Sequence, residues 1–269
     1  MAMMVIFFLL GLIIGSFLNV VAIRLEVAES LLGRSHCPHC QARVRWHDNI
    51  PLLSFVLLGA RCRDCGEKIS AQYFWVELLT GIIFALVGSL FFDPLVLATW
   101  TETTFYLVMS SILIVIFVYD FRSMEIPMTV VWSGVIMALL YSIYADWTGF
   151  GAGHKFLEFR TFAGVVGGAV AFLFFFLISY FSKERWMGMG DAYVGLLIGL
   201  VVGWPLILLA LTSSFTIGAV FGLMLIALGK KTMQSQVPFA PFLVLGTFCV
   251  IILDKIYPQL IDLFWPFVS

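Results

Sequence analysis

Long apolar runs, separated by short polar segments, occupy most of the chain. A membrane-spanning helix needs about 20 mostly apolar residues. The pattern therefore predicts an all-α polytopic membrane protein with about eight transmembrane helices. Their predicted ranges are 3–23, 72–92, 97–119, 129–145, 160–181, 190–203, 205–228 and 239–256. The run 190–203 is short, and Gly203-Trp204-Pro205 interrupts the pattern after it, so it and the next run are alternatively a helical hairpin or one kinked element.

The composition supports the membrane class and excludes others. Hydrophobic residues make up 62% of the chain and charged residues 12%, and the mean hydropathy is +1.05. A soluble domain has about a quarter charged residues, and a disordered chain is far less apolar. A membrane β-barrel is excluded because it shows alternating apolar and polar positions over segments of about ten residues, whereas the runs here are unbroken.

The distribution of basic residues predicts the orientation. No basic residue precedes the first apolar run and Arg24 follows it, which argues against a cleaved signal peptide and for an uncleaved anchor with its N-terminus outside. With this orientation 12 of the 15 Lys and Arg residues fall on cytoplasmic segments, as the positive-inside rule requires. Those segments are 24–71, 120–128, 182–189 and 229–238. The aromatic stretch 257–269 is predicted to be interfacial.

Residues 24–71 form the one long polar segment and contain two Cys-x-x-Cys pairs, 37/40 and 62/65. Four thiolates can complete a tetrahedral zinc site. A segment this short cannot bury much hydrophobic core, so a bound metal ion would help to stabilise its fold. Because four thiolates leave no open position, we expect structural zinc held by Cys37, Cys40, Cys62 and Cys65. Disulfides are the main alternative, disfavoured in a reducing compartment. Substitution of one Cys ligand by a histidine is another, at His36, His39 or His47.

The same segment is basic and aromatic. Arg43, Arg45 and Trp46 are compatible with binding of a phosphate-bearing lipid or a nucleotide-like cofactor. A cytoplasmic loop that obeys the positive-inside rule explains them more simply. The fifth cysteine, Cys249, falls in the last apolar run and is expected to be a small buried hydrophobic residue.

Two acidic residues lie at the ends of predicted spans on the same side of the membrane. Asp120 follows the third span, and Asp191 opens the sixth in the sequence Gly188-Met189-Gly190-Asp191. Carboxylates at the membrane edge are costly and usually functional. Two carboxylates at one depth can share a proton and activate water for peptide hydrolysis. The flanking glycines allow close approach of an extended peptide.

Structural explanations compete with this one. Asp191 is also placed as a helix N-cap, and Asp120 as an ion-pair partner of Arg122. Three other acidic residues fall within predicted spans, where each is a candidate for a polar cavity or a local pair. They are Glu77, Glu102 and Asp254.

Taken together, the motifs resemble the bacterial type IV prepilin peptidases, the GxGD membrane aspartyl proteases, over about residues 11–246. The similar segments occur in the family's order. They are Gly15–Val20, Arg34–Cys40, Trp46–Pro51 with Leu53-Ser54, Arg61–Gly66, Ile69–Tyr73 with Glu77-Leu78, Asp120 with Ile126-Pro127, Gly188–Asp191 and Val237–Phe242.

The resemblance implies two activities in a bacterial cytoplasmic membrane. The first is removal of the leader peptide from type IV prepilins or type II secretion pseudopilins, with Asp120 and Asp191 as the catalytic pair and Gly188 and Gly190 positioning the substrate. The second is N-methylation of the new N-terminus from S-adenosylmethionine, linked to the zinc-binding segment. The zinc domain and active site would face the cytoplasm, and the partners would be pilin-type substrates and membrane lipid, with no nucleic acid.

The resemblance also implies three domains: a first transmembrane helix (1–23), a cytoplasmic zinc-binding domain (24–71) and a transmembrane peptidase domain (72–269). Tyr193, Met128 and Ala240 depart from the family pattern. No glycine-rich cofactor loop identifies the S-adenosylmethionine site. A peptidase without methyltransferase activity, and a non-enzymatic transporter or scaffold, are the alternatives. Archaeal preflagellin peptidases are disfavoured because they generally lack the Cys pairs.

Overall fold

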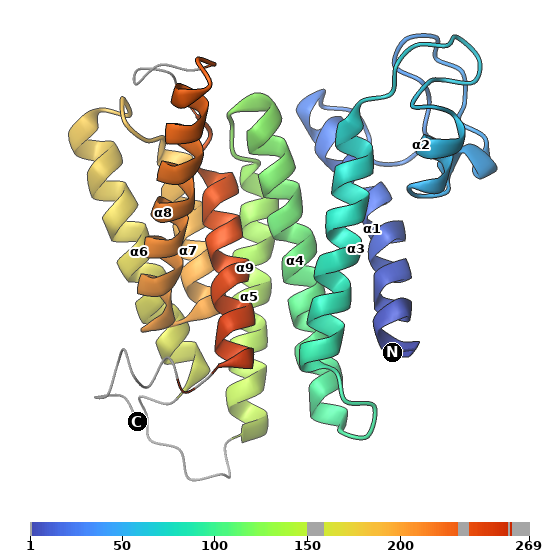
Figure 1. Ribbon diagram of the computed structural model, residues 1–269. Coiled ribbons are helices and arrows are strands. Elements are labelled where there is room, and N and C mark those ends of the chain that lie inside the picture. The colour runs from blue at the N-terminus through green and yellow to red at the C-terminus, as the bar shows by residue number, and fades with distance from the viewer. Residues whose placement is uncertain (1, 150–158, 231–236, 258, 260–269) are drawn as a thin grey trace. The chain divides into compact units, whose positions relative to one another are not determined.

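The computed structural model describes residues 2–149, 159–230, 237–257 and 259 (Figure 1). These residues fold into α-helices joined by short loops, with one longer irregular segment between the first helix and the third. The elements are α1 (Ala2–Glu26), η1 (Trp46–Asn49, a 3-10 turn), α2 (Leu53–Leu57), α3 (Ala71–Phe91), α4 (Leu97–Ser123), α5 (Met128–Gly149), α6 (Arg160–Ser182), α7 (Met189–Val202), α8 (Leu206–Ala227) and α9 (Ala240–Ile256).

Every apolar run predicted to span the membrane lies on one of these helices. Six described helices are long and apolar enough to cross a bilayer, namely α1, α3, α4, α5, α6 and α8. This confirms an all-helical protein with several candidate spans. Helices α7 and α9 have 14 and 17 residues, fewer than a perpendicular span needs. The predicted total of about eight spans therefore stays a prediction.

The boundary between α7 and α8 settles one alternative. Helix α7 ends at Val202, and Gly203 has a φ of +78°, a conformation that favours glycine. The next N–H, that of Trp204, turns away and donates to the carbonyl of Ala163 at 2.8 Å. The interpretation of these two runs as one kinked element is therefore wrong. The predicted interfacial stretch 257–269 lies almost entirely outside the described residues.

The chain divides into two compact units, residues 1–119 and 120–269, with the boundary inside α4. In the first unit, α1 and α3 pack closely because small residues face each other. A Cβ at Gly11 would lie 2.7 Å from the carbonyl oxygen of Thr80 and 2.8 Å from Cα of Gly81. A Cβ at Gly15 would lie 2.9 Å from Cα of Glu77. Small residues let two membrane helices approach until their backbones touch.

The second unit uses the same device between α6 and α7. A Cβ at Gly164 would lie 3.0 Å from the carbonyl oxygen of Leu200, and one at Gly167 would lie 2.9 Å from that of Gly199. The close pairing fixes the short helix α7 against a long neighbour. The N-terminus of α7, which carries the Gly-Met-Gly-Asp sequence, is thereby held by a rigid support.

Candidate metal centre and candidate active site

The first Cys pair sits in a tight backbone loop. The N–H of Cys37 donates to the carbonyl of Ala42 at 3.0 Å, and the N–H of Gln41 donates to the carbonyl of Cys37 at 2.9 Å. Gln41 has a φ of +60°, and an isolated bridge pairs His36 with Arg43. The chain thus turns back on itself immediately after the second cysteine of the pair.

The second Cys pair repeats this geometry. The N–H of Cys62 donates to the carbonyl of Glu67 at 2.8 Å, and the N–H of Gly66 donates to the carbonyl of Cys62 at 2.9 Å. Gly66 has a φ of +72°, and an isolated bridge pairs Arg61 with Lys68. Two equivalent loops, which we call the first and second knuckles (36–43 and 61–68), therefore present their sulfurs in the same way.

The four sulfurs form a cluster that fits one metal ion. The Sγ atoms of Cys37, Cys40, Cys62 and Cys65 all lie within 4.8 Å of one another, and those of Cys37 and Cys65 are 3.9 Å apart. Zn–S bonds of about 2.3 Å in a tetrahedron place sulfurs about 3.8 Å apart. In the described residues the cluster contains only cysteines, and all five cysteines are free. The fifth, Cys249, lies on the exposed surface of α9, so the prediction that it is buried is wrong. The donor set thus suits zinc without a histidine or a disulfide.

One sulfur of the second knuckle, that of Cys62, lies in a backbone environment that favours the thiolate. The N–H groups of Cys65 and Asp64 face the sulfur of Cys62 and lower the pKa of Cys62 to about 7. A metal binds the thiolate and not the thiol, so this backbone prepares one ligand for coordination near neutral pH.

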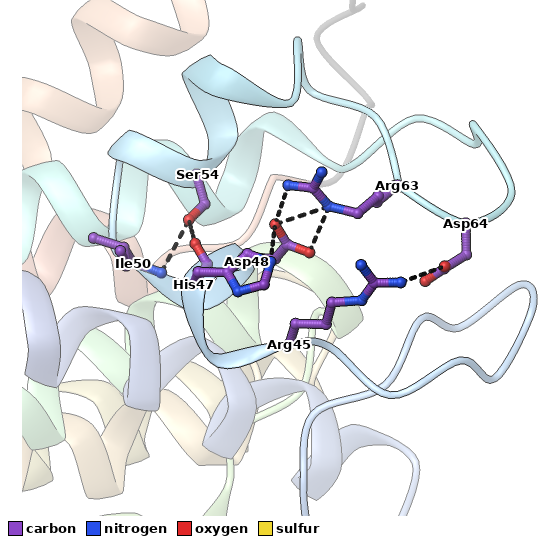
Figure 2. A network of polar contacts seen from close by, with 7 residues as sticks. All are labelled: Arg45, His47, Asp48, Ile50, Ser54, Arg63 and Asp64. Atoms are coloured by element: carbon purple, nitrogen blue, oxygen red, sulfur yellow. Dashed lines mark hydrogen bonds and ion pairs between the residues drawn. The ribbon is translucent and has the colours of Figure 1, made fainter.

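An ion pair joins the segment between the knuckles to the second knuckle (Figure 2). Arg63 donates from Nη2 to Oδ1 of Asp48 at 2.6 Å and from Nε to Oδ2 at 2.9 Å. The guanidinium lowers the pKa of Asp48 below its ordinary value. A looser pair joins Arg45 to Asp64 at 3.6 Å. Because Arg63 and Asp64 separate the two cysteines of the knuckle, both pairs fix 45–48 beside the sulfur cluster.

Ser54 connects η1 to α2 within the same segment (Figure 2). Its hydroxyl donates to the carbonyl of His47 at 2.9 Å and accepts the N–H of Ile50 at 3.0 Å. Ser54 is buried although the segment as a whole is polar. This side chain closes the turn that the sequence Trp46–Pro51 makes.

Glu77 connects this segment to α3. Its Oε2 accepts the N–H of Leu52 at 2.8 Å, and the hydroxyl of Ser16 also donates to it. Leu52 has a φ of +59°, an uncommon conformation for a branched residue. Glu77 is buried, so its carboxylate serves as a fixed acceptor inside the first unit. Of the two expectations for this residue, a local pair is the one the contacts support.

Asp120 lies in the last turn of α4, since the helix continues to Ser123 and not only to the predicted 119. It is 4% exposed, and its Oδ2 accepts the N–H of Ala240 at 3.2 Å. Phe239, the residue before Ala240, packs its ring on those of Phe175 and Phe215, with centroids 5.9 and 4.9 Å away. The Pro-Phe-Ala-Pro sequence therefore holds a backbone donor against this carboxylate.

Asp191 lies in the first turn of α7 and is 8% exposed. The N-cap of the helix is Gly188, whose carbonyl accepts the N–H of Asp191 at 3.3 Å. No side chain caps this helix, so the interpretation of Asp191 as an N-cap is wrong. The carboxylate is buried in the first turn and accepts the backbone N–H of Gly188, so it supports the start of α7 without being its N-cap residue.

The two carboxylates belong to the same unit and interact electrostatically. The segment after Asp120 also contacts the start of α7, because Ile126 packs directly on Gly190. Buried carboxylates close enough to sense each other's charge favour a state in which one is protonated and the other ionised. Such a pair can act as acid and base on one water molecule.

The three departures from the family pattern have structural roles of their own. The ring of Tyr193 lies 5.8 Å from that of Trp132 and 5.6 Å from that of Phe172, between α5 and α6. Met128 is the first residue of α5. Ala240 is fully buried and supplies the N–H to Asp120. The last contact is one that the sequence did not predict, because a backbone donor has no residue-type signal.

These observations define a helical membrane protein with a cluster of four cysteines that could hold a metal ion and two buried carboxylates in one unit. Comparison of the sequence with family models gives two matches: the bacterial peptidase A24 N-terminal domain over residues 9–91 and the type IV leader peptidase family over residues 107–223. The chain belongs to the type IV leader peptidase family. It is therefore an enzyme, and the transporter or scaffold alternative is not favoured. Asp120 and Asp191 both fall within the second match.

Individual relatives agree with this assignment. A prepilin leader peptidase/N-methyltransferase of Myxococcus xanthus is 37% identical over 85% of this chain and 65% of its own length. A type 4 prepilin-like proteins leader peptide-processing enzyme of Escherichia coli is 34% identical over 92% of this chain and 93% of its own. A prepilin leader peptidase/N-methyltransferase of Bacillus subtilis is 30% identical, with 91% and 92% covered. No solved structure matches the chain.

Proposed function

We propose that the chain removes the leader peptide of type IV prepilins or pseudopilins and then methylates the new N-terminal amine with S-adenosylmethionine. Family membership supports the peptidase activity, and the names of the similar proteins from Myxococcus xanthus and Bacillus subtilis support both activities. The observation that carries the peptidase half is the burial of Asp120 and Asp191 in one unit, within electrostatic range of each other.

In this proposal Asp120 and Asp191 hydrolyse the peptide bond together. One carboxylate takes a proton from water, whose oxygen attacks the scissile carbonyl carbon, while the other carboxylic acid donates its proton to the carbonyl oxygen. When the tetrahedral intermediate collapses, the C–N bond breaks and the departing amine takes up a proton. No metal or covalent intermediate is needed. Gly188 leaves room near Asp191 for an extended substrate backbone, whereas Ile126 already packs against Gly190.

The proposed topology places this chemistry at the cytoplasmic face. Helices α7 and α9 join the six longer helices to give eight spans, and the N-terminus lies outside. The positive-inside count supports this arrangement. It divides the chain into a first helix (1–23), a zinc-binding domain (24–71) and a peptidase domain (72–269). A positively charged leader stays in the cytoplasm, so it is cut there.

The four knuckle cysteines would hold zinc as a structural ion, since four thiolates leave no position for substrate. When bound, zinc supplies a crosslink between the two knuckles. Methylation transfers the methyl group of the sulfonium to the amine and releases S-adenosylhomocysteine and a proton. We link this step to the zinc-binding domain. A peptidase without methyltransferase activity is the second candidate, because no residue of the described chain identifies the methyl donor's site.

Single substitutions test the peptidase proposal. Asp120→Asn and Asp191→Asn should each abolish leader cleavage of a prepilin by the purified full-length protein, with zinc content and thermal stability unchanged. Asp254→Asn is the matched control, because this carboxylate lies at the opposite end of α9 from Ala240. Full cleavage by either of the first two variants would remove the aspartyl mechanism. With labelled S-adenosylmethionine, a cleaved but unlabelled pilin would support the peptidase-only alternative.

A further inference from the structure

An open recess lies beside the first knuckle and is lined by polar and cationic side chains. Its lining residues are Arg34, His36, Gln41 and Arg43, and its volume is about 460 Å³. A volume of this order accommodates a small polar ligand. No carboxylate is among the lining residues, so the recess offers hydrogen-bond donors and positive charge.

The two arginines of the recess have no ionic partner among the described residues. The ion pairs found among the described residues involve Arg45, His47 and Arg63, and none of them involves Arg34 or Arg43. A guanidinium presents five N–H donors in a planar fork that matches the oxygens of a phosphate or carboxylate. The donors of Arg34 and Arg43 are therefore available to an anion from outside the chain.

A third arginine adds buried positive charge next to the recess. Arg24 is only 7% exposed, and its guanidinium donates to the carbonyls of Ser30 at 3.2 Å, Leu31 at 2.9 Å and Arg34 at 3.2 Å. All three acceptors are neutral carbonyls, and none of the ion pairs found among the described residues involves Arg24. A buried charge without a counter-ion is unfavourable, and an anion bound near Arg34 would offset it.

The hydrogen bond from Arg24 to the carbonyl of Arg34 places the recess next to the end of α1. Arg24 belongs to the last turn of α1, a candidate span, and its hydrogen bond to Arg34 ties the edge of the recess to that helix end. Between them, Val27 is 56% exposed and Leu32 is 88% exposed. Exposed apolar side chains beside basic ones, at the end of a span, are typical of a surface at the level of lipid headgroups.

We propose that this recess, formed by Arg34, His36, Gln41 and Arg43, binds the phosphate of an anionic membrane lipid headgroup. Val27 and Leu32 contact the apolar part of the same lipid layer. Inorganic phosphate shares the headgroup chemistry but gains nothing from these apolar neighbours. S-Adenosylmethionine has one carboxylate that an arginine of the recess could bind, but its sulfonium and ammonium are both positive and no lining carboxylate receives them, so a phosphate headgroup is the better match.

The test measures binding of the full-length protein to nanodiscs or micelles that contain phosphatidylglycerol, with phosphatidylcholine as the uncharged comparison. The variant Arg34→Gln/Arg43→Gln should bind the anionic lipid about 25-fold more weakly, because each basic side chain near an anionic surface contributes roughly a fivefold gain. Arg34→Lys/Arg43→Lys should keep most of the affinity.

The second knuckle supplies a matched control. Arg61 and Lys68 occupy the positions equivalent to His36 and Arg43, so Arg61→Gln/Lys68→Gln removes the same charge from the same domain outside the recess. This control should bind phosphatidylglycerol as the unmodified chain does, and zinc content should be equal in all variants. Equal loss in both double variants, or no loss in either, would overturn the proposal.

Soluble ligands distinguish the sources of the anion. Glycerol phosphate and inorganic phosphate should compete only weakly with phosphatidylglycerol. If they bind as tightly as the lipid does, the recess serves a soluble anion and the lipid proposal is wrong. It is equally wrong if Arg34→Gln/Arg43→Gln loses S-adenosylmethionine binding while lipid binding is unchanged. These readouts do not depend on leader cleavage, so they are independent of the proposed function.

Discussion

Ile126 packs very closely on Gly190. A Cβ at position 190 would lie 2.5 Å from the Cγ1 of Ile126 and 2.9 Å from the Cβ of Ile126. This contact joins the segment that follows Asp120 to the first turn of α7, which carries Asp191. The other glycine of the motif differs. A Cβ at Gly188 would have nothing closer than the backbone nitrogen of Gly190 at 4.0 Å. Gly190 is therefore required by the packing of Ile126, whereas Gly188 lies beside open space.

Gly190→Ala should destabilise the protein by about 1–3 kcal/mol, because the added methyl group overpacks a contact with no room. Leader cleavage should fall with it, since α7 must shift away from Ile126. Gly188→Ala should leave the thermal midpoint unchanged and, if substrate passes there, raise KM. Thermal unfolding in detergent and cleavage kinetics measure the two effects. Ile126→Ala in the Gly190→Ala background should restore part of the stability, and failure to do so would place the strain elsewhere.

Zinc content is the second prediction. The purified chain should hold about one zinc ion, and Cys62→Ser should lower that content and loosen the second knuckle. Zinc affinity should fall as the pH falls, because protons compete for the thiolates. Cys62, whose pKa is lowered to about 7 by neighbouring backbone N–H groups, should be the thiol deprotonated most readily. Metal analysis over a pH series measures this. Cys249→Ser, on α9, is the control and should retain zinc.

The ion pair between Asp48 and Arg63 gives the third prediction. Asp48→Asn should speed the loss of zinc to a chelator at neutral pH, because the pair holds 45–48 beside the knuckle. Asp64→Asn, which breaks the longer pair with Arg45, should have a smaller effect. The pKa of Asp48 is lowered in the folded chain, so the pair's contribution is present above the ordinary value of 3.8. It is lost as the pH falls through the lowered pKa.

High salt should reduce the difference between the Asp48→Asn variant and the unmodified chain, because ions screen exposed pairs. The exchange variant Asp48→Arg/Arg63→Asp should recover part of the slow zinc release if the contact acts through charge. If the single and exchange variants release zinc equally fast, the pair has another role.

The sequence predicted the helices well and the tertiary contacts poorly, for a physical reason. Runs of about 20 apolar residues have few alternatives to a helix, and paired Cys-x-x-Cys spacing has few alternatives to a metal site. Asp191 was placed at the start of a helix correctly, but its burial was not visible. The hydrogen bond between Ala240 and Asp120 joins residues 120 positions apart and uses a backbone donor. Neither periodicity nor residue type reports such a contact.

The contact between Glu77 and Leu52 is another that the sequence does not predict, and it gives the last prediction. Its carboxylate accepts the N–H of Leu52, and Leu52 is held at a positive φ just before α2. Glu77→Ala removes the acceptor and leaves that donor unmatched in a half-buried position, which should cost about 1 kcal/mol or somewhat more. Glu77→Gln keeps an acceptor oxygen of the same reach and should cost less.

Hydrogen exchange localises this effect. In Glu77→Ala the amide of Leu52 and those of α2 (Leu53–Leu57) should exchange faster, while the amides of the first knuckle keep their protection. Glu77→Gln should show intermediate exchange at the same positions. Because α2 lies between the two knuckles in sequence, its release from α3 should also reduce methylation more than leader cleavage, if methylation depends on the zinc-binding segment. Equal reduction of both activities would mean that Glu77 supports the whole fold and not that segment.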